Sequence, residues 1–286
     1  MWKSLVLALA AALAAGAAQA RPPVWTVRDR DSELVLFGSV HVLPPGLDWK
    51  PPALDRALKS ADDVWFELPV DAASEAEVAR LAAAQGVLPP GQTLSAMLGP
   101  PDAARLARVA QAFGASMPLI DRLEPWFAEV VLAVTLYARS GGTADAGVEK
   151  AVSAALPATA VRRSFETPAE QVALFDGAPM PEQIASLDET LGEMETDPHQ
   201  YEQLLAAWMA GDVAALDREA LAPLRKASPA LFKRMLTDRN ARWMGPLTAR
   251  LAGKGRTVVV VGVGHLIGSG GLPARLRALG YSVEGP

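Results

Sequence analysis

Hydrophobic positions divide the chain into short strand-like runs and long helical stretches. Two runs, 24–29 and 33–38, flank the turn-prone residues 30–32 and predict a β-hairpin. Further strands are predicted at 63–68, at 158–166, and in the segments RTVVVVG and YSVE close to the C-terminus.

Between these strands, leucine, alanine and valine recur three to four positions apart, which is typical of amphipathic helices. Helices are predicted at 51–62, through most of 72–156, from 167 to about 252, and around LPARLRALG. Because helices separate the strands along the chain, we predict an α/β fold with a central mixed, largely parallel sheet flanked by helices. No linker divides the chain, so residues 21–286 are predicted to form one domain.

The first twenty residues differ from the rest of the chain. They contain a lysine near the start, a short alanine-rich apolar stretch and the small-residue end Ala18-Gln19-Ala20. This is the plan of a signal peptide cleaved after Ala20. The competing interpretation is a membrane anchor, but the apolar stretch is short for a span of ~20 residues. We therefore expect a periplasmic or secreted protein with no stable membrane anchor after cleavage.

Composition excludes several kinds of chemistry. The chain has no cysteine, so it has neither disulfides nor thiolate nucleophiles nor thiolate metal ligands. Its formal net charge is -5, and lysine and arginine are scattered, so we expect no nucleic-acid partner.

Two aliphatic runs, one near each end of the chain, stop at the pattern Gly-x-x-His. LVLFGSVHVLPPG places His41 three residues after Gly38, and TVVVVGVGHLIGSGG places His265 three residues after Gly262. Ligands of open α/β sheets bind beyond the carboxyl ends of the strands. The two histidines are therefore predicted to meet if their strands are neighbours, with a helical insertion between the two Gly-x-x-His halves. Two unrelated loop histidines are the alternative.

The second glycine segment superficially resembles a dinucleotide-binding loop. It follows a predicted strand, precedes a predicted helix, and has Glu284 about twenty residues beyond. The third glycine, Gly268, is one residue late for the dinucleotide pattern, and the chain ends two residues after Glu284. We therefore do not expect a nucleotide.

Two glutamates close predicted strands, Glu67 in VWFEL and Glu166 in AVRRSFE. Two histidines with one or two carboxylates suit a divalent metal that activates water. They suit equally a metal-free acid–base pair, in which a carboxylate tunes an imidazole. A surface or helix-capping role is the alternative for either glutamate.

Arg239 and Asn240 lie within a predicted helix that leads towards the last long strand. Asparagine is a poor helix former, so the pair is a candidate for contacting an anionic group or a developing oxyanion. An ordinary solvated helix face is the alternative. His199 follows Asp197-Pro198 at a predicted helix start and is not assigned to the site, and Ser39 has no nucleophile-elbow motif around it.

Several short motifs together resemble the TraB/GumN family across nearly all of residues 21–286. In chain order they are FGSVHVLP, VWFEL, the Pro-Trp pair at 125–126, FETPAEQ, AWMAGD, RNARW and VVGVGHLIGSGGLPARLRALGYSV. The family is similar to the Tiki metalloproteases and, more distantly, to erythromycin esterases and haem-binding ChaN proteins. One departure is Gly147-Val148-Glu149, where the family pattern has aspartate after Gly-Val.

The resemblance implies a role for each matching residue. The expected metal ligands are His41, His265 and Glu67, holding Mn, Co or Zn, and the expected catalytic residues are Glu67, Glu166, Arg239 and Asn240. The function implied is an exported metal-dependent hydrolase acting on a peptide or another acyl substrate. A non-catalytic periplasmic protein that binds haem, a metal or a peptide is the alternative, and a metal-free esterase is a third.

Overall fold

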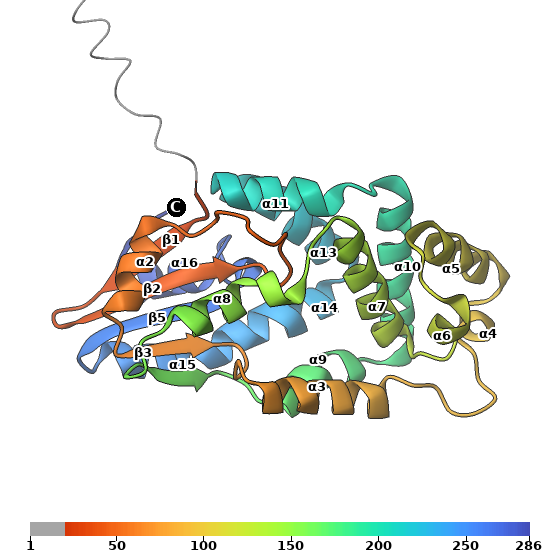
Figure 1. Cartoon of the computed structure of the whole chain (residues 1–286), viewed down its shortest axis with the longest axis horizontal. Coiled ribbons are helices and arrows are strands. Elements are labelled where there is room, and N and C mark those ends of the chain that lie inside the picture. The colour runs from red at the N-terminus through yellow and green to blue at the C-terminus, as the bar shows by residue number, and fades with distance from the viewer. Residues whose placement is uncertain (1–20) are drawn as a thin grey trace, which may run out of the picture.

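A six-stranded sheet in the order β4-β3-β5-β2-β1-β6 organises the computed structural model, which describes residues 21–286 (Figure 1). The predicted signal peptide, residues 1–20, lies outside this described part. The strands are β1 (Val24–Arg28), β2 (Ser32–Ser39), β3 (Asp63–Phe66), β4 (Val161–Ser164), β5 (Gly255–Gly262) and β6 (Ser282–Glu284). β1 pairs antiparallel with β2 and with β6, and the three other strand pairs are parallel, so the predicted mixed, largely parallel sheet is confirmed.

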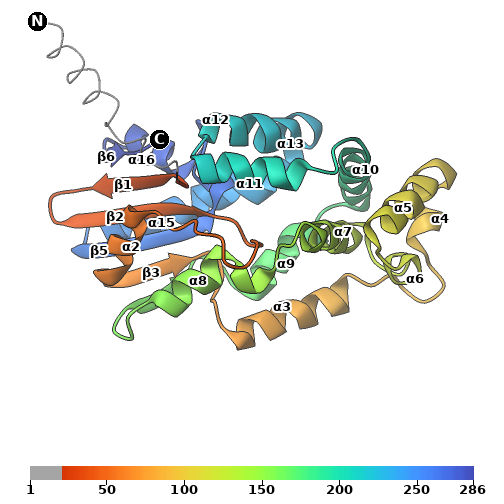
Figure 2. The same ribbon diagram turned by 45° about the horizontal axis from the view of Figure 1, so that its top comes forward.

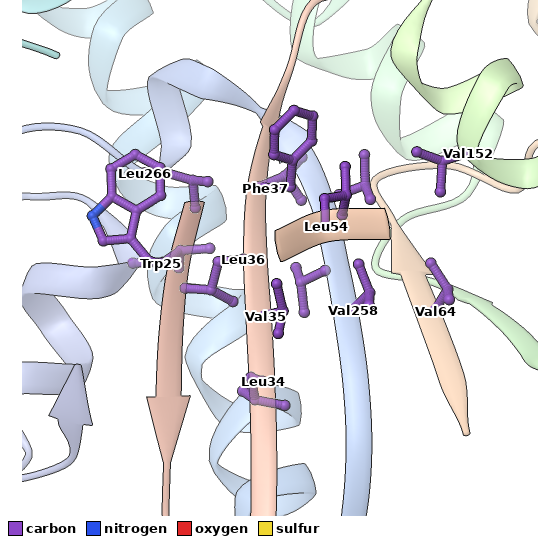
Figure 3. Close-up of a cluster of buried hydrophobic side chains, with 14 of the residues drawn as sticks. Trp25, Leu34, Val35, Leu36, Phe37, Leu54, Val64, Val152, Val258 and Leu266 are labelled. Carbon is purple, nitrogen blue, oxygen red and sulfur yellow. The ribbon is translucent and has the colours of Figure 1, made fainter. Parts of the chain in front are cut away.

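The centre of the sheet is its most buried part. The four-valine run of β5, Val258–Val261, is buried along its whole length, as expected for a parallel strand covered on both faces. Val35, Val258 and Val64 come from three neighbouring strands, lie in one register row and pack side by side (Figure 3). These contacts hold β2 and β3 on either side of β5.

Helices cover both faces of the sheet. Helices α2 (Pro52–Lys59) and α8 (Val148–Ala155) lie on one face, and α15 (Asp238–Leu251) and α16 (Leu272–Ala278) lie on the other (Figures 1 and 2). All four contribute buried residues to the same hydrophobic cluster as the strands. The proline at the start of α2 and of α16 suits the first helical turn, where its missing N–H has no intrahelical partner.

The predicted helical insertion forms a block beside the carboxyl edge of the sheet (Figure 2). It is built from two chain segments rather than one, because β4 and α8 return to the sheet between them. The first contains α3 (Ala72–Gln85), α4 (Leu94–Leu98), α5 (Pro100–Phe113), α6 (Met117–Ile120) and α7 (Pro125–Arg139). The second contains α9 (Pro168–Asp176), α10 (Met180–Thr196), α11 (Gln200–Ala210), α12 (Val213–Leu216), α13 (Ala222–Ala227) and α14 (Pro229–Phe232).

Four short helical segments join these elements: the 3-10 turns η1 (Ala144–Ala146) and η4 (Val263–His265), and the π-helical η2 (Asp217–Leu221) and η3 (Lys233–Thr237). Part of the helical block has a hydrophobic cluster of its own, made by α4, α5, α6, α7 and α10 and separate from the cluster around the sheet. Within residues 21–286, no helix combines the length and apolar character that crossing a membrane requires.

Several predicted boundaries differ from the observed ones. The predicted strand 158–166 is only four residues long, and the predicted helix 51–62 ends at Lys59. The last two strands follow the predicted strand–helix–strand order, but β5 and β6 are not neighbours. The reason is that the N-terminal hairpin, β1 with β2, lies between them and pairs with both.

Candidate functional site

The carboxyl ends of four parallel strands meet at one edge of the sheet, as the strand-end motifs predict. Ser39 at the end of β2 is in register with Gly262 at the end of β5, and Phe66 at the end of β3 is in register with Val260. Beyond this edge, the backbone N–H of Glu166 donates to the carbonyl of Glu67. His41, Glu67, Glu166 and His265 therefore all follow strands that end side by side.

The first glycine of each Gly-x-x-His motif is required by close packing. A Cβ on Gly38 would lie 2.7 Å from Cγ2 of Val263, so a side chain here would push the two motifs apart. A Cβ on Gly262 would lie 3.2 Å from Oε1 of Glu67 and 3.9 Å from Nε2 of His41. The absence of side chains at both glycines lets the two ends of the chain approach closely.

Arg239 is the centre of the buried part of the site. Its Nε and Nη2 donate to the two oxygens of Glu166, both at 2.8 Å, in a bidentate pair. Its Nη2 also donates to Oε2 of Glu67 at 2.5 Å, and its Nη1 donates to the carbonyl of Met235 at 3.2 Å. Nη1 lies 3.0 Å from Nε2 of His265 as well, so all five guanidinium N–H groups have partners.

Asn240 orients His265 from the next position on α15. Its Nδ2 donates to the carbonyls of Gly270 at 3.0 Å and His265 at 3.3 Å, so its Oδ1 faces Nδ1 of His265 at 2.7 Å. This arrangement makes Nδ1 the protonated nitrogen of the ring and leaves Nε2 to accept from Arg239. Both Asn240 and His265 are buried, and the indole of Trp243 packs against the imidazole at 4.4 Å between ring centroids.

His41 lies on the open side of the site, with 65 % of its side chain exposed. Its Nδ1 is 2.8 Å from Oε1 of Glu149, which belongs to the first turn of α8. The start of α8 packs so closely on the His41 backbone that a Cβ on Gly147 would lie only 2.2 Å from the His41 carbonyl oxygen. Glu149 was not among the predicted site residues, although the Gly147-Val148-Glu149 motif was its signal.

The two histidines have pKa values shifted in opposite directions. The negative charge of Glu149 is the main reason that the pKa of His41 rises to about 9. Burial is the main reason that the pKa of His265 falls to about 4, and Arg239 and His41 lower it further. At neutral pH, His41 is therefore protonated and His265 is neutral.

Glu67 stays ionised although it is buried. Burial raises its pKa, but His265, Arg239, His41 and the Gly262 N–H act in the opposite direction and bring it to about 2. Because His265 is itself neutral at neutral pH, the stabilisation of the Glu67 carboxylate there comes from Arg239, His41 and Gly262, whose N–H donates to Oε1 at 2.6 Å.

The site opens into a cavity of ≈ 540 Å³ between the sheet edge and the helical block. His41, Glu67, Arg239 and His265 line its sheet side, and residues of α7, α9, α10, η2, α13, α14 and η3 line much of the rest. His199, which was not assigned to the site, is exposed at the start of α11 and does not line this cavity. Ser39 is buried at the end of β2.

The residues as arranged do not fit a metal held by His41, His265 and Glu67. His265 has no free nitrogen lone pair, because Nδ1 donates to Asn240 and Nε2 accepts from Arg239. A cation near Glu67 would also lie beside the guanidinium of Arg239, which repels it. Over residues 21–286, no group of three histidine, cysteine, aspartate or glutamate side chains has the geometry to hold a metal ion.

Fold and site together define an α/β protein whose two Gly-x-x-His motifs, from opposite ends of the chain, form one cluster with buried carboxylates and an arginine. A model of the TraB/PrgY/gumN family matches residues 23–285, and the chain belongs to this family. It is similar to the uncharacterized protein YbaP of Escherichia coli K12 and to that of Shigella flexneri, each 27 % identical over 243 residues. Those matches cover 85 % of this chain and 87 % of each relative. No solved structure matches the chain.

Proposed function

We propose that this protein is a hydrolase that cleaves a peptide or another acyl bond by metal-free acid–base catalysis at the His41–Glu67 pair. The observation that carries the proposal is the convergence of a protonated, exposed His41 and an ionised, buried Glu67 on Gly262, in the wall of a cavity. Pairs of titratable groups whose environments separate their pKa values are typical of acid and base partners.

In the proposed reaction, Glu67 orients a water molecule and accepts its proton as the water oxygen attacks the acyl carbon. The protonated His41 stabilises the negative charge that develops on the carbonyl oxygen. When the tetrahedral intermediate collapses, the acyl carbon–leaving group bond breaks and His41 gives its proton to the departing amine or alcohol. Solvent then returns the proton from Glu67 to His41.

Other residues position these two groups. Glu149 fixes the orientation of His41 through Nδ1, so that Nε2 faces the Gly262 position, in the manner of the carboxylate in a catalytic triad. Arg239 holds Glu67, and Glu166 and His265 hold Arg239. Asn240 holds His265.

The expectation of a Mn, Co or Zn ion on His41, His265 and Glu67 stays a prediction, and it requires Arg239 to move away from His265. From residues 1–20 we also infer that the protein is exported and cleaved after Ala20. Sequencing the N-terminus of the protein recovered from its producing cells tests this, and Arg21 is the expected first residue.

Hydrolysis is tested with p-nitrophenyl esters and a fluorogenic peptide library, in the presence and absence of a chelator. We expect turnover that resists chelation and falls at least ~100-fold in His41→Gln and in Glu67→Gln, because general acid–base groups typically contribute 10²–10⁴-fold. His199→Gln is the matched control, since His199 is exposed outside the site, and it is expected to retain full activity.

Two outcomes would contradict the proposal. Turnover that is lost on chelation and restored by Mn, Co or Zn, with one ion bound per chain in a His41-dependent manner, would establish the metal-dependent mechanism instead. No hydrolysis of any substrate, together with a Soret band on haem titration that disappears in His41→Gln, would establish a non-catalytic haem-binding protein.

A further inference from the structure

Three carboxylates line the cavity next to the site, and two of them are paired with arginines. Glu67 pairs with Arg239, and Glu182 accepts from Nη2 of Arg234 at 2.6 Å. The third, Glu129, has no arginine, lysine or histidine within ion-pair distance among residues 21–286. Glu129 is therefore the one carboxylate of the three that has no cationic side chain beside it in the described part of the chain.

Two hydroxyl groups on α10 hold the Glu129 carboxylate in place. Ser186 donates to Oε1 at 3.1 Å, and Thr190 donates to the same oxygen at 2.9 Å. Oε2 accepts no hydrogen bond from any residue that the structure describes. A carboxylate that is oriented through one oxygen and open at the other is suited to accept hydrogen bonds from a bound molecule.

Aromatic residues line the same cavity as this carboxylate. Trp126, one turn before Glu129 on the same face of α7, stacks with Phe175 at 6.0 Å between ring centroids, and Tyr137 lines the wall two turns further on. Aromatic faces next to a carboxylate attract organic cations, because the ring quadrupole adds to the ionic attraction. A wall of this kind favours an ammonium group over a neutral group of the same size.

We propose that Glu129 binds a protonated amino group of the substrate, so that the protein acts on acyl compounds that carry a primary ammonium. That the bound molecule is a substrate rests on the proposed hydrolase, whereas binding of an ammonium group at Glu129 requires no catalysis. The acyl group lies at His41 and Glu67, and the ammonium lies at the α7 side of the same ≈ 540 Å³ cavity. Burial raises the pKa of Glu129, as do Glu189 and Glu193, and an ammonium group bound beside the carboxylate would act in the opposite direction by stabilising its ionised form.

The test compares two probes of the same size, benzylamine and benzyl alcohol, by titration calorimetry of the purified protein at pH 7 and low ionic strength. We expect wild type to bind benzylamine at least ~10-fold more tightly than benzyl alcohol. Glu129→Gln preserves the acceptor oxygen for Ser186 and Thr190, and it is expected to abolish this preference without changing the affinity for the alcohol. Glu193→Gln is the matched control, because Glu193 contributes to the same field without lining the cavity.

Equal affinity of wild type for the amine and the alcohol would overturn the inference, and this comparison does not depend on the folding of any variant. An equal loss of amine binding in Glu129→Gln and Glu193→Gln would also overturn it. The preference for the amine would then come from the long-range field of several carboxylates and not from a direct contact with Glu129. Amine preference without hydrolysis of any substrate would leave the ammonium site standing while the proposed hydrolase failed. Hydrolysis without a preference for the amine would support the proposed hydrolase and overturn the ammonium site.

Discussion

Arg239 is the residue on which the buried half of the site depends. It is 3 % exposed and holds two glutamates that are themselves buried. Taking charges out of water is expensive, and removing one partner of a buried pair leaves the others uncompensated. The same residue therefore contributes both to the stability of this region and to the ionisation of Glu67.

We predict that Arg239→Met lowers the free energy of unfolding by about 3–5 kcal/mol, because Glu67 and Glu166 lose their charged partner in a buried site. Urea denaturation at pH 7 measures the change. Arg242→Met is the control, since Arg242 reaches the same Glu166 at 3.4 Å but is 55 % exposed, and it should cost less than about 1 kcal/mol. Similar losses in the two variants would contradict the central role of Arg239.

The two site histidines are expected to titrate far apart. His265 has a pKa of about 4 when folded and an ordinary value of 6.5 when unfolded, so between these pH values the unfolded chain binds the extra proton. Stability therefore falls as the pH drops from 6.5 to 4, by on the order of 3 kcal/mol from this group at about 1.4 kcal/mol per pKa unit. His41 has the opposite sign: its contribution is complete below pH 6.5 and is lost as the pH rises through about 9.

NMR titration of the imidazole resonances separates these contributions, with each signal assigned from a histidine→glutamine variant. His41 is expected to stay protonated beyond pH 8, and His265 is expected to stay neutral with its proton on Nδ1 down to about pH 5. A midpoint near 6.5 for His265 would show that the ring is not held by Asn240 and Arg239 as described.

At the scale of the elements, the site is made by how closely strand ends and one helix start approach each other. The β2 and β5 ends pack through Gly38 and Val263, and α8 begins against the backbone of His41 through Gly147. The first turn of α8 then directs Glu149 to the imidazole. Gly38 and Gly147 are therefore required because a side chain at either position would collide with a neighbouring segment of the chain.

We predict that Gly147→Ala lowers the free energy of unfolding by about 1–3 kcal/mol, the usual range for overpacking, because the new methyl group would meet the His41 carbonyl. The shift of α8 should also separate Glu149 from His41, so that the pKa of His41 moves down towards its ordinary value. Thermal or urea unfolding and the same NMR titration measure the two effects.

Gly192→Ala is the control for this substitution. Gly192 lies inside α10, and beyond the backbone of its own helix no atom lies within 4 Å of an added Cβ, so alanine there should be neutral or stabilising by up to about 1 kcal/mol. Loss of stability in Gly192→Ala equal to that in Gly147→Ala would mean that the close contact is not the cause.

At the scale of the whole molecule, a sheet core and a separate helical core enclose the cavity from two sides. The sheet core contains the central strands with α2, α8, α15 and α16, and the helical core lies between α4, α5, α6, α7 and α10. The site residues follow strands of the first, whereas Glu129 belongs to a helix of the second. A ligand in the cavity therefore contacts both.

We predict that hydrogen exchange distinguishes the two cores. The amides of β2 and β5, which pair over eight residues in the middle of the sheet, should exchange most slowly, and those of α4 to α6 should exchange much faster. Mass spectrometry of peptides after exchange for increasing times measures this. Equal protection of the two regions would indicate that they open as one cooperative unit.

The local pattern of residues was enough to predict the α/β class, the strands that precede both histidines, and the glutamates at the ends of β3 and β4. These predictions depend on nearest neighbours: a buried parallel strand is an aliphatic run, and its end is marked by glycine or a charge. The lengths of β4 and α2 were overestimated, because hydrogen bonds to neighbouring elements determine where a strand or helix stops.

The contacts of each site residue could be identified only from the tertiary structure. The pairing of β2 with β5 brings His41 and His265 together across more than 200 residues, and nothing in either segment specifies that pairing. Glu149 reaches His41 only because α8 begins against the backbone of Val40 and His41, and Arg239 lies among Glu67, Glu166 and His265 only because α15 begins at the same edge of the sheet. Charge, burial and pKa at the site follow from those packed distances, which composition and spacing along the chain do not encode.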